Sequence, residues 1–406
     1  MTTSLEVLEP IFNDNYVAIA ANSSNEYVPY LSVYLESIKN QSSNDTNYDV
    51  VILECSITDE NKAILKETFE TQPNLSLRFY NPLNLFINSQ LEVSHFYLCK
   101  ESYFRLGAPI IFKNYKKLIF TDVDLMFNNN PKELYDIEMN NAPILAVLEP
   151  IWSIWINNNK TINNINIKEY TDKILKLKNP YRYFNTGVML MDIDKINNDN
   201  IGEILLSKLS TGTKYLYQDQ DVLNEVLSTQ MGILPFEWNC EILDKRLNGA
   251  EEFIKDYCNF EKRNIIHWIG SEKPWINKER EHSYKWWKLA RKSAYYEVIF
   301  EQSLFQKFQQ KINLLEEKYT NLHRENLLLQ NQKYNELMQA DNQIKDKLSE
   351  MIFHIANYRK YTISYWRYKL LSKILPGKKR KHYIEKKKFY KNKINIVKQI
   401  REGKYV

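Results

Sequence analysis

The chain has 406 residues, 44% of them hydrophobic, which is enough apolar material for one large α/β domain or two smaller ones. Its net charge of +5 hides an asymmetry, because residues 356–406 hold 17 of the 55 Lys and Arg residues but only two of the 50 Asp and Glu residues. The remaining 38 basic and 48 acidic residues give the upstream part a net charge of −10, which disfavours a nucleic-acid-binding protein.

The N-terminal residues lack the basic start and apolar stretch of a signal peptide, and they carry Glu6, Glu9 and Asp14. No window reaches the roughly 18 consecutive apolar residues that a membrane-spanning helix needs. The four cysteines form no Cys-x-x-Cys pair, which suits a reducing compartment and argues against a structural zinc site. We therefore expect a cytoplasmic protein.

Strand-like and helix-like segments alternate along the first 295 residues or so. The expected strands cover residues 16–21, 48–53, 75–80 and 117–121, and the expected helices cover residues 27–38, 58–69 and 96–105. Such alternation predicts a mostly parallel, doubly wound α/β sheet with ligands at the carboxyl ends of its strands. The chain has only nine glycines and no glycine-rich phosphate loop, so phosphate must be held in another way.

The segment Phe120-Thr121-Asp122-Val123-Asp124 delivers two carboxylates to the end of the fourth expected strand. Because strand side chains alternate between faces, Asp122 and Asp124 emerge on the same side. Two oxygen ligands there can hold a hard divalent cation, which in turn can hold a diphosphate. The hypothesis is a metal-dependent transferase that uses a nucleotide-sugar.

Asp-x-Asp occurs at two further places, where structural roles are the alternative. Asp194, in the pair with Asp192, is more readily explained as a cap of a turn or short helix. Asp219 and Asp221 lie in a polar entry into a helix, where acidic residues favour the helix dipole.

Beyond residue 300 the pattern changes to apolar residues at alternating spacings of three and four, from Phe305 to Leu329 and, after a one-residue slip, from Tyr334 to Tyr358. This pattern predicts a coiled coil over residues 300–356, with Asn326 fixing its register and a second copy of the chain as partner. One long helix packed on its own domain is the alternative.

Residues 357–406 mix aromatic, aliphatic and basic side chains, which suits an anionic membrane surface. Nucleic acid is the alternative ligand for so basic a tail.

Four blocks stand in order along the chain: FTDVDLMF from Phe120, YFNTGVMLMD from Tyr183, YQDQDVLN from Tyr217 and HWIGSEKPW from His267. Together they resemble the retaining glycosyltransferases of family 8, which include bacterial lipopolysaccharide galactosyl- and glucosyltransferases. The resemblance runs from about Tyr16 to Trp287 and implies a GT-A type, Rossmann-like catalytic domain over residues 1–295.

The resemblance implies that Asp122, Asp124 and His267 are metal ligands, and the mixed carboxylate and imidazole set suits Mn²⁺, with Mg²⁺ as the alternative. It also implies that Gly270 and Lys273 approach the donor diphosphate, where Lys273 stabilises the leaving group. The resemblance also assigns residues that bind the nucleotide-sugar. The family's nucleotide loop corresponds to Ala20, Asn22 and Tyr27, and Tyr27 is expected to stack on uracil. Asn22 stands where relatives often carry Asp, and the loop that follows is longer.

Arg105 matches a family arginine near the diphosphate and sugar, although an ordinary cation on a helix surface is the alternative. Asn185, Asp219 and Gln220 match residues around the donor sugar, with Gln220 near the anomeric carbon. An amide in place of a carboxylate nucleophile favours front-face displacement over a covalent glycosyl-enzyme.

The function that the resemblance implies is transfer of glucose or galactose from a UDP-sugar to a saccharide or lipid-linked saccharide of a bacterial surface glycan such as lipopolysaccharide. The enzyme would act on the inner face of the cytoplasmic membrane as a peripheral homo-oligomer. The alternative is a catalytically idle coiled-coil scaffold or glycan-binding protein at the membrane. Retention of the predicted metal and sugar residues argues against that alternative.

Overall fold

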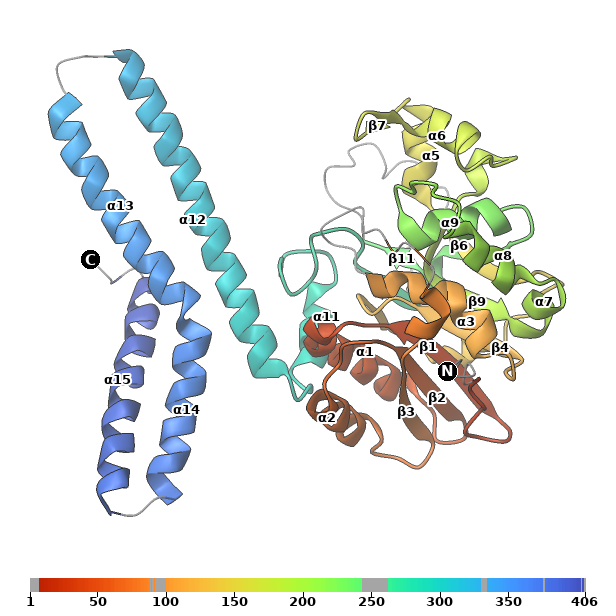
Figure 1. Cartoon of the computed structure of the whole chain (residues 1–406), viewed down its shortest axis with the longest axis horizontal. Coiled ribbons are helices and arrows are strands. Elements are labelled where there is room, and N and C mark those ends of the chain that lie inside the picture. The colour runs from red at the N-terminus through yellow and green to blue at the C-terminus, as the bar shows by residue number, and fades with distance from the viewer. Residues whose placement is uncertain are drawn as a thin grey trace. The chain divides into compact units, whose positions relative to one another are not determined.

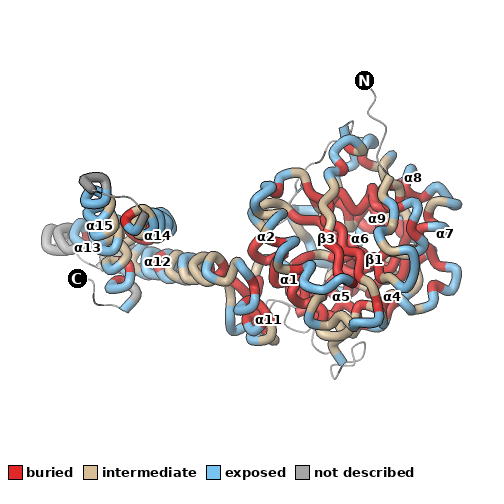
Figure 2. The backbone as a smooth tube through the Cα atoms, turned by 90° about the horizontal axis from the view of Figure 1, so that it is seen from below, coloured by how far each residue is buried: buried red, intermediate tan, exposed pale blue. Residues whose placement is uncertain are grey.

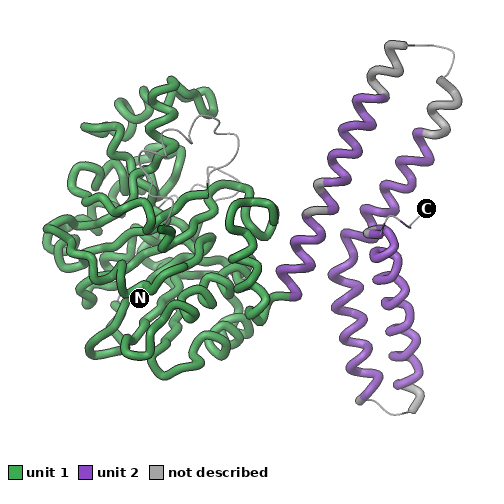
Figure 3. Tube along the Cα trace, turned by 180° about the vertical axis from the view of Figure 1, so that it is seen from behind, with its two compact units in different colours: residues 1–296 green, residues 297–406 purple. Residues whose placement is uncertain are grey.

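The computed structural model describes residues 7–87, 89, 91, 100–242, 262–329, 334–374, 377–402 and 404. The chain divides into two compact units, residues 1–296 and residues 297–406 (Figure 3).

A seven-stranded sheet forms the centre of the first unit (Figure 1). Its spatial order is β10-β6-β9-β4-β1-β2-β3, and β9 is the strand that runs antiparallel to its neighbours. The mostly parallel α/β fold predicted from the sequence is therefore confirmed. The strands are β1 (Tyr16–Asn22), β2 (Asn47–Leu53), β3 (Leu75–Tyr80), β4 (Lys117–Thr121), β6 (Ile144–Leu148), β9 (Phe184–Asp192) and β10 (Gly232–Ile233).

Helices cover both faces of this sheet because its strands are apolar on both sides. Val17 and Ile19 of β1 belong to a core cluster with α1 and α2, whereas Ala18 and Ala20 belong to a second cluster with α8 and α9. Figure 2 shows the resulting buried interior of this unit. The longer helices are α1 (Val28–Gln41), α2 (Asp59–Phe69), α5 (Pro150–Asn157), α6 (Ile167–Lys173), α7 (Ile193–Asn198), α8 (Ile201–Lys208), α9 (Gln218–Leu227) and α11 (Ser283–Ala290). The short ones are α3 (Ala108–Ile111), α4 (Pro131–Tyr135) and the 3₁₀ helices η1 (Asn25–Tyr27), η2 (Leu83–Phe86), η3 (Lys100–Gly107), η4 (Pro180–Arg182) and η5 (Phe236–Trp238).

Two local predictions need correction. The helix expected over residues 96–105 is the 3₁₀ helix η3 where it is described, and residues 92–99 lie outside the described part. Pro109 follows in the first turn of α3 and has no N–H to continue an α-helix from η3. At α7 the cap is Asp192, whose carboxylate accepts a hydrogen bond from the Lys195 N–H at 2.9 Å, whereas Asp194 lies exposed in the first turn.

Residues 150–183, which we call the lobe, form a small folded part that follows β6 and precedes β9. It contains α5, the two-stranded pair β7 (Thr161–Ile162) and β8 (Ile165–Asn166), α6 and η4. Its core includes Trp152, Ile167, Tyr170 and Tyr183. No elements were predicted in this stretch, because it contains no long periodic run of apolar residues.

A second, three-stranded sheet places β12 between β11 and β5. The strand β12 (Ile265–His267) runs parallel to β11 (Cys240–Glu241) and antiparallel to β5 (Leu125–Phe127). This sheet brings the C-terminal part of the unit back to the carboxylates that precede β5.

The second unit consists of α12 (Tyr296–Leu329), α13 (Tyr334–Ala356), α14 (Tyr358–Ile374) and α15 (Gly377–Arg401). The heptad stretch is thus divided between α12 and α13, and residues 330–333 lie outside the described part. Ile312 of α12 and Ile355 of α13 share a core with Val397 and Ile400 of α15. The register role predicted for Asn326 cannot be placed, because its side chain is not among those described.

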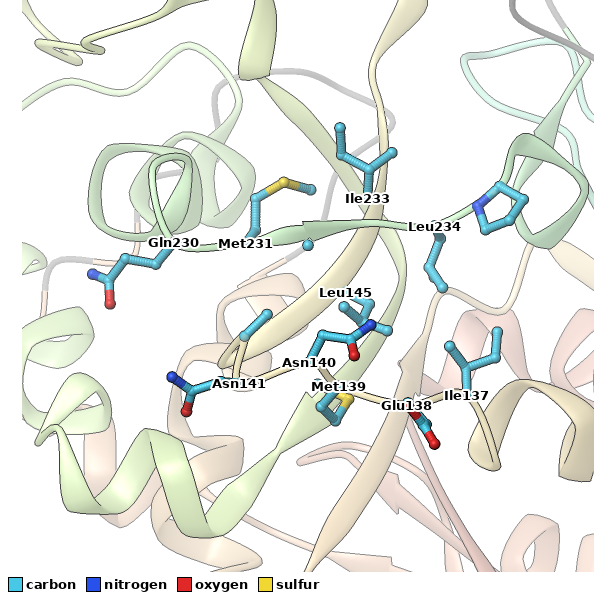
Figure 4. A pocket seen from close by; sticks show the side chains of 13 residues that line it. Ile137, Glu138, Met139, Asn140, Asn141, Leu145, Gln230, Met231, Ile233 and Leu234 are labelled. Atoms are coloured by element: carbon cyan, nitrogen blue, oxygen red, sulfur yellow. The ribbon is translucent and has the colours of Figure 1, made fainter.

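A pocket of about 340 Å³ lies between the start of β6 and β10, lined by residues such as Leu145, Gln230 and Met231 (Figure 4). It contains none of the predicted site residues. It lies at the amino end of β6, whereas ligands of such sheets bind at the carboxyl ends.

Candidate active site

The structure brings the three predicted metal ligands together at the carboxyl end of β4. Asp122 and Asp124 occupy the turn between β4 and β5, and His267 ends β12 directly opposite Leu125 of β5. One ligand atom from each of Asp122, Asp124 and His267 lies within 4.8 Å of the others. The antiparallel pairing of β5 with β12 therefore supplies the imidazole that the linear sequence places 143 residues away.

The imidazole of His267 is held from both ring nitrogens. Nδ1 contacts Oδ1 of Asn239 at 2.9 Å, and Nε2 lies 3.0 Å from Oδ1 of Asp124 and 3.7 Å from Oδ2 of Asp122. The Asn239 amide is oriented because its Nδ2 donates to Oδ1 of Asn185 at 2.9 Å. Its Oδ1 therefore faces His267 and favours the proton on Nδ1, which leaves Nε2 as a ligand atom.

Two buried cations balance the charge of the carboxylates. Arg105 forms ion pairs with Asp122 and, at 2.9 Å, with Asp219, and it also donates to the Thr186 carbonyl. It is 3% exposed, so the alternative of a surface cation is wrong. Lys273 forms an ion pair with Asp124 and donates to the Trp268 carbonyl at 2.8 Å.

The pKa of Asp124 shows which of these effects dominates. Burial alone would raise it, but the charges and hydrogen bonds of Lys273 and His267 outweigh burial and hold it well below its usual range. Asp124 therefore stays ionised, as a metal ligand must be.

Gly187 and Gly270 lie in the segments that carry these groups, and each position favours glycine for a different reason. A Cβ atom on Gly187 of β9 would lie 2.4 Å from Cε1 of His267 and 2.9 Å from Oδ2 of Asp122, so the backbone of β9 passes against the ligands. Gly270 has a φ of +73° with open space around it, and this conformation favours glycine.

Asp219 and Gln220 lie at the start of α9, next to the carboxylates. Burial, and to a smaller extent the nearby Asp122, raise the pKa of Asp219 to about 6 against the opposing charge of Arg105. Oε1 of Gln220 accepts hydrogen bonds from the N–H of Thr186 at 3.1 Å and from its hydroxyl at 3.3 Å. Asn185 directly precedes Thr186 on β9, and Nδ2 of Asn185 donates to Glu149 at 2.8 Å.

The residues predicted for the nucleotide lie at the end of β1 and the start of α1. Ala20 is fully buried, and Asn22 donates to the Ser102 carbonyl at 3.4 Å while its Oδ1 has no hydrogen-bond partner among the described residues. The ring of Tyr27 meets that of Trp275 edge to face at 6.2 Å. Trp275 comes from the same block as Lys273, so the two ends of the predicted donor site adjoin.

Sequence reasoning missed Asn239, Glu149 and Glu241. Glu149 and Glu241 are both buried, burial raises the pKa of each, and the negative charge of Glu149 raises that of Glu241 further. Neither carboxylate oxygen of Glu241 has a hydrogen-bond partner among the described residues. No spacing in the sequence marks these three residues, because only the pairing of β11 with β12 and the turn after β6 bring them here.

The donor set fits a divalent cation on chemical grounds. Two carboxylates and one imidazole converge, the imidazole is oriented by an amide, and buried cations already offset the negative charge. Such a set suits Mn²⁺.

Comparisons with known proteins identify the family of the chain. The sequence model of the family described as "Glycosyl transferase family 8" matches residues 18–279. The lipopolysaccharide 1,2-glucosyltransferase of Escherichia coli K12 is 28% identical over 196 residues, which cover 46% of this chain and 53% of that protein.

Among solved structures, the bifunctional glycosyltransferase WbbM superposes with a TM-score of 0.64 and 24% identity, covering 73% of this chain and 53% of that one. The galactosyltransferase LgtC, solved with donor and acceptor sugar analogues, superposes with a TM-score of 0.53 and 19% identity over 68% of this chain and 96% of that one. At these identities the structures establish the likeness of the fold.

Proposed function

The chain belongs to glycosyl transferase family 8, and from this membership we propose that it is a metal-dependent, retaining hexosyltransferase that uses UDP-glucose or UDP-galactose. The observation that carries the proposal is the convergence of Asp122, Asp124 and His267 at the carboxyl end of β4, within ion-pair reach of Lys273 and Arg105. Family membership alone would leave open whether the chemical groups are in place.

Asp122, Asp124 and His267 would hold the divalent cation, Mn²⁺ in this proposal, which supplies positive charge at the donor diphosphate. Lys273 is placed to add a second positive charge as the UDP leaves. Ala20, Asn22 and Tyr27 would bind the nucleoside, and Gly270 would let the backbone come close to the phosphates. Oδ1 of Asn22, which has no hydrogen-bond partner within the described part of the chain, is a suitable acceptor for the N–H of a base.

Asn185, Asp219 and Arg105 would position the donor sugar, with Gln220 beside its anomeric carbon. Both hydrogen bonds accepted by Oε1 of Gln220 come from Thr186, so that oxygen is a poor candidate for a nucleophile. This supports front-face displacement with retention, in which the departing phosphate oxygen helps to deprotonate the acceptor.

The acceptor we propose is a saccharide, or a lipid-linked saccharide, of a bacterial surface glycan such as lipopolysaccharide. The similarity to the E. coli lipopolysaccharide glucosyltransferase supports this class of acceptor. Trp155 of the lobe and Tyr217, which precedes α9, stack with ring centroids 6.1 Å apart and offer ring faces of the kind that sugars pack against.

We also propose that the second unit attaches to an anionic membrane surface on the cytoplasmic side. No helix in the described part of the chain has both the length and the apolar character of a bilayer-spanning segment. Helix α14 has two apolar faces: Tyr368 stacks on Tyr390 of α15, whereas Ile363, Trp366 and Leu370 are 57–59% exposed.

The exposed stripe lies at positions i, i+3 and i+7, and Lys369 lies 4.0 Å above the Trp366 ring. Apolar side chains framed by cations match a lipid headgroup boundary better than a nucleic-acid backbone. Tight binding to nucleic acid, with no flotation on anionic vesicles, would contradict this part of the proposal.

A homo-oligomer through the heptad helices is the third part of the proposal. Ile312 is buried within the unit, but Leu315 and Leu322 of the same heptad series are 45% and 58% exposed. These exposed positions are available to a second copy. Light scattering should give a mass above that of one chain, and Leu315→Lys with Leu322→Lys should return it to the monomer.

The catalytic proposal is tested by screening nucleotide-sugars for turnover with and without Mn²⁺, followed by NMR of the product linkage. UDP-glucose or UDP-galactose should be consumed only with the metal, and the product should be α-linked. A β-linkage, or full turnover in excess chelator, would contradict the mechanism. Absence of turnover with every nucleotide-sugar would favour the idle scaffold.

A further inference from the structure

Asp221, the second acid of the third Asp-x-Asp pair, lies outside the machinery proposed above and is fully buried. Its Oδ2 accepts hydrogen bonds from the Tyr170 hydroxyl at 2.6 Å and the Tyr217 N–H at 2.7 Å. Its Oδ1 accepts from the Tyr183 hydroxyl at 2.6 Å. Burial is the largest cause that raises the pKa of both tyrosines, and Asp221 raises them further, so both hydroxyls remain protonated donors.

The hydrogen-bond chain extends from Asp221 through Tyr183 to Gln220. Because the Tyr183 hydroxyl donates its hydrogen bond to Asp221, the hydroxyl oxygen is free to accept one. Nε2 of Gln220 donates to this oxygen at 3.3 Å. Oε1 of the same amide then faces the Thr186 N–H at 3.1 Å. The amide has only one orientation that satisfies both neighbours.

On the basis of the proposed function, we propose that Asp221 is a positioning residue that fixes the orientation of the Gln220 amide through the Tyr183 hydroxyl. Tyr170 comes from α6 and Tyr183 follows η4, so the same carboxylate also joins the lobe to the start of α9. The chemistry at Gln220 therefore depends on a buried acid that does not face the substrate.

The substitution Asp221→Asn tests this direction without a large change in shape. The oxygen that replaces Oδ2 must remain an acceptor, because the Tyr217 N–H and the Tyr170 hydroxyl both donate to it. The new amide nitrogen is therefore forced toward Tyr183. Tyr183 becomes the acceptor, its proton turns toward Gln220, and the Gln220 amide can no longer satisfy both Tyr183 and Thr186.

Tyr170→Phe is the matched control, because it removes one hydrogen bond from the same carboxylate and leaves the branch from Asp221 through Tyr183 to Gln220 intact. Asp221→Asn should lower kcat for sugar transfer about 10- to 100-fold with the donor KM within about twofold. Tyr170→Phe should lower the melting temperature by about as much as Asp221→Asn does, but it should keep kcat within about threefold of wild type.

A double-variant cycle separates positioning from a merely structural role. If Asp221 acts through Gln220, Asp221→Asn should cause little further loss of kcat in a Gln220→Ala background. An equal fold-loss in both backgrounds, or equal kcat losses for Asp221→Asn and Tyr170→Phe, would overturn the proposal.

The same cycle measured by urea unfolding needs no activity, so it is informative even if the wild-type chain turns over no nucleotide-sugar. The change in the unfolding constant of the double variant should be at least threefold smaller than the product of the two single changes. Independent effects would overturn the network itself, whereas coupling without turnover would count only against the proposed function.

Discussion

Gly187→Ala is the sharpest test of the site, because it adds one methyl group against its predicted metal ligands. The new Cβ would lie 2.4 Å from Cε1 of His267, 2.9 Å from Oδ1 of Asn185 and 2.9 Å from Oδ2 of Asp122. Ordinary contact begins at 3.4 Å, so the imidazole must move by about 1 Å. A displacement of that size in a positioned group costs on the order of 10²-fold in turnover, or about 2.7 kcal/mol.

The assay is Mn²⁺ affinity by calorimetry together with metal-dependent donor turnover. Gly202→Ala is the matched control, since its Cβ would be crowded at 3.2 Å by Pro109 and at 3.3 Å by Ile110, away from the predicted ligands. Overpacking should cost each variant up to about 1–3 kcal/mol of stability. Only Gly187→Ala should lose metal affinity and turnover. A folded Gly187→Ala protein with both within twofold of wild type would refute this geometry.

Three further predictions follow from other residues. Asp124→Asn should remove Mn²⁺ binding and nearly all turnover because the ligand charge is lost, while Asp194→Asn, the same change at an exposed Asp-x-Asp position, should leave both unchanged. Glu241→Gln should melt higher than wild type by a margin that grows as pH rises above about 4.5. Above that pH Glu241 ionises in the unfolded chain, whereas its raised pKa keeps it protonated in the native state, so the wild type loses about 1.4 kcal/mol of stability for each unit by which the pKa is raised. A margin that does not change with pH would mean that Glu241 is neutralised by a partner. In vesicle flotation, the full chain should float with anionic but not neutral lipid and be released by high salt; the triple change Ile363→Ser, Trp366→Ser and Leu370→Ser should abolish flotation, and Phe353→Ser, an equally exposed aromatic on α13, should not.

The parts of the site that could be predicted are those whose chemistry is local in the sequence. An apolar run followed by Asp122 and Asp124 predicts a strand that ends in two carboxylates, since strand periodicity alone sets their common side. Burial on both faces of β1 and β4 likewise follows from their uninterrupted apolar residues. His267, in contrast, was expected at the site only through the resemblance to a family.

The parts that could not be predicted depend on contacts between distant segments. Asn239 orients His267 across 28 residues, and Gly187 is required by a close approach of β9 that leaves no mark on periodicity. The acids of the pair Asp219 and Asp221 were explained by the helix dipole, yet both are buried and bonded to specific partners. Local rules fail where a functional site overrides them.

The buried ion pairs hold together the groups that we propose to bind the donor. Arg105 joins the carboxylate of Asp122 to that of Asp219, so the proposed metal end and the proposed sugar end of the site are held by one buried cation. A planar guanidinium can span two carboxylates in this way, whereas the single ammonium of Lys cannot. The lobe has its own hydrophobic core and adjoins this assembly through Tyr170 and Tyr183. Its surface can therefore vary without a change in the buried groups that we propose to bind the donor.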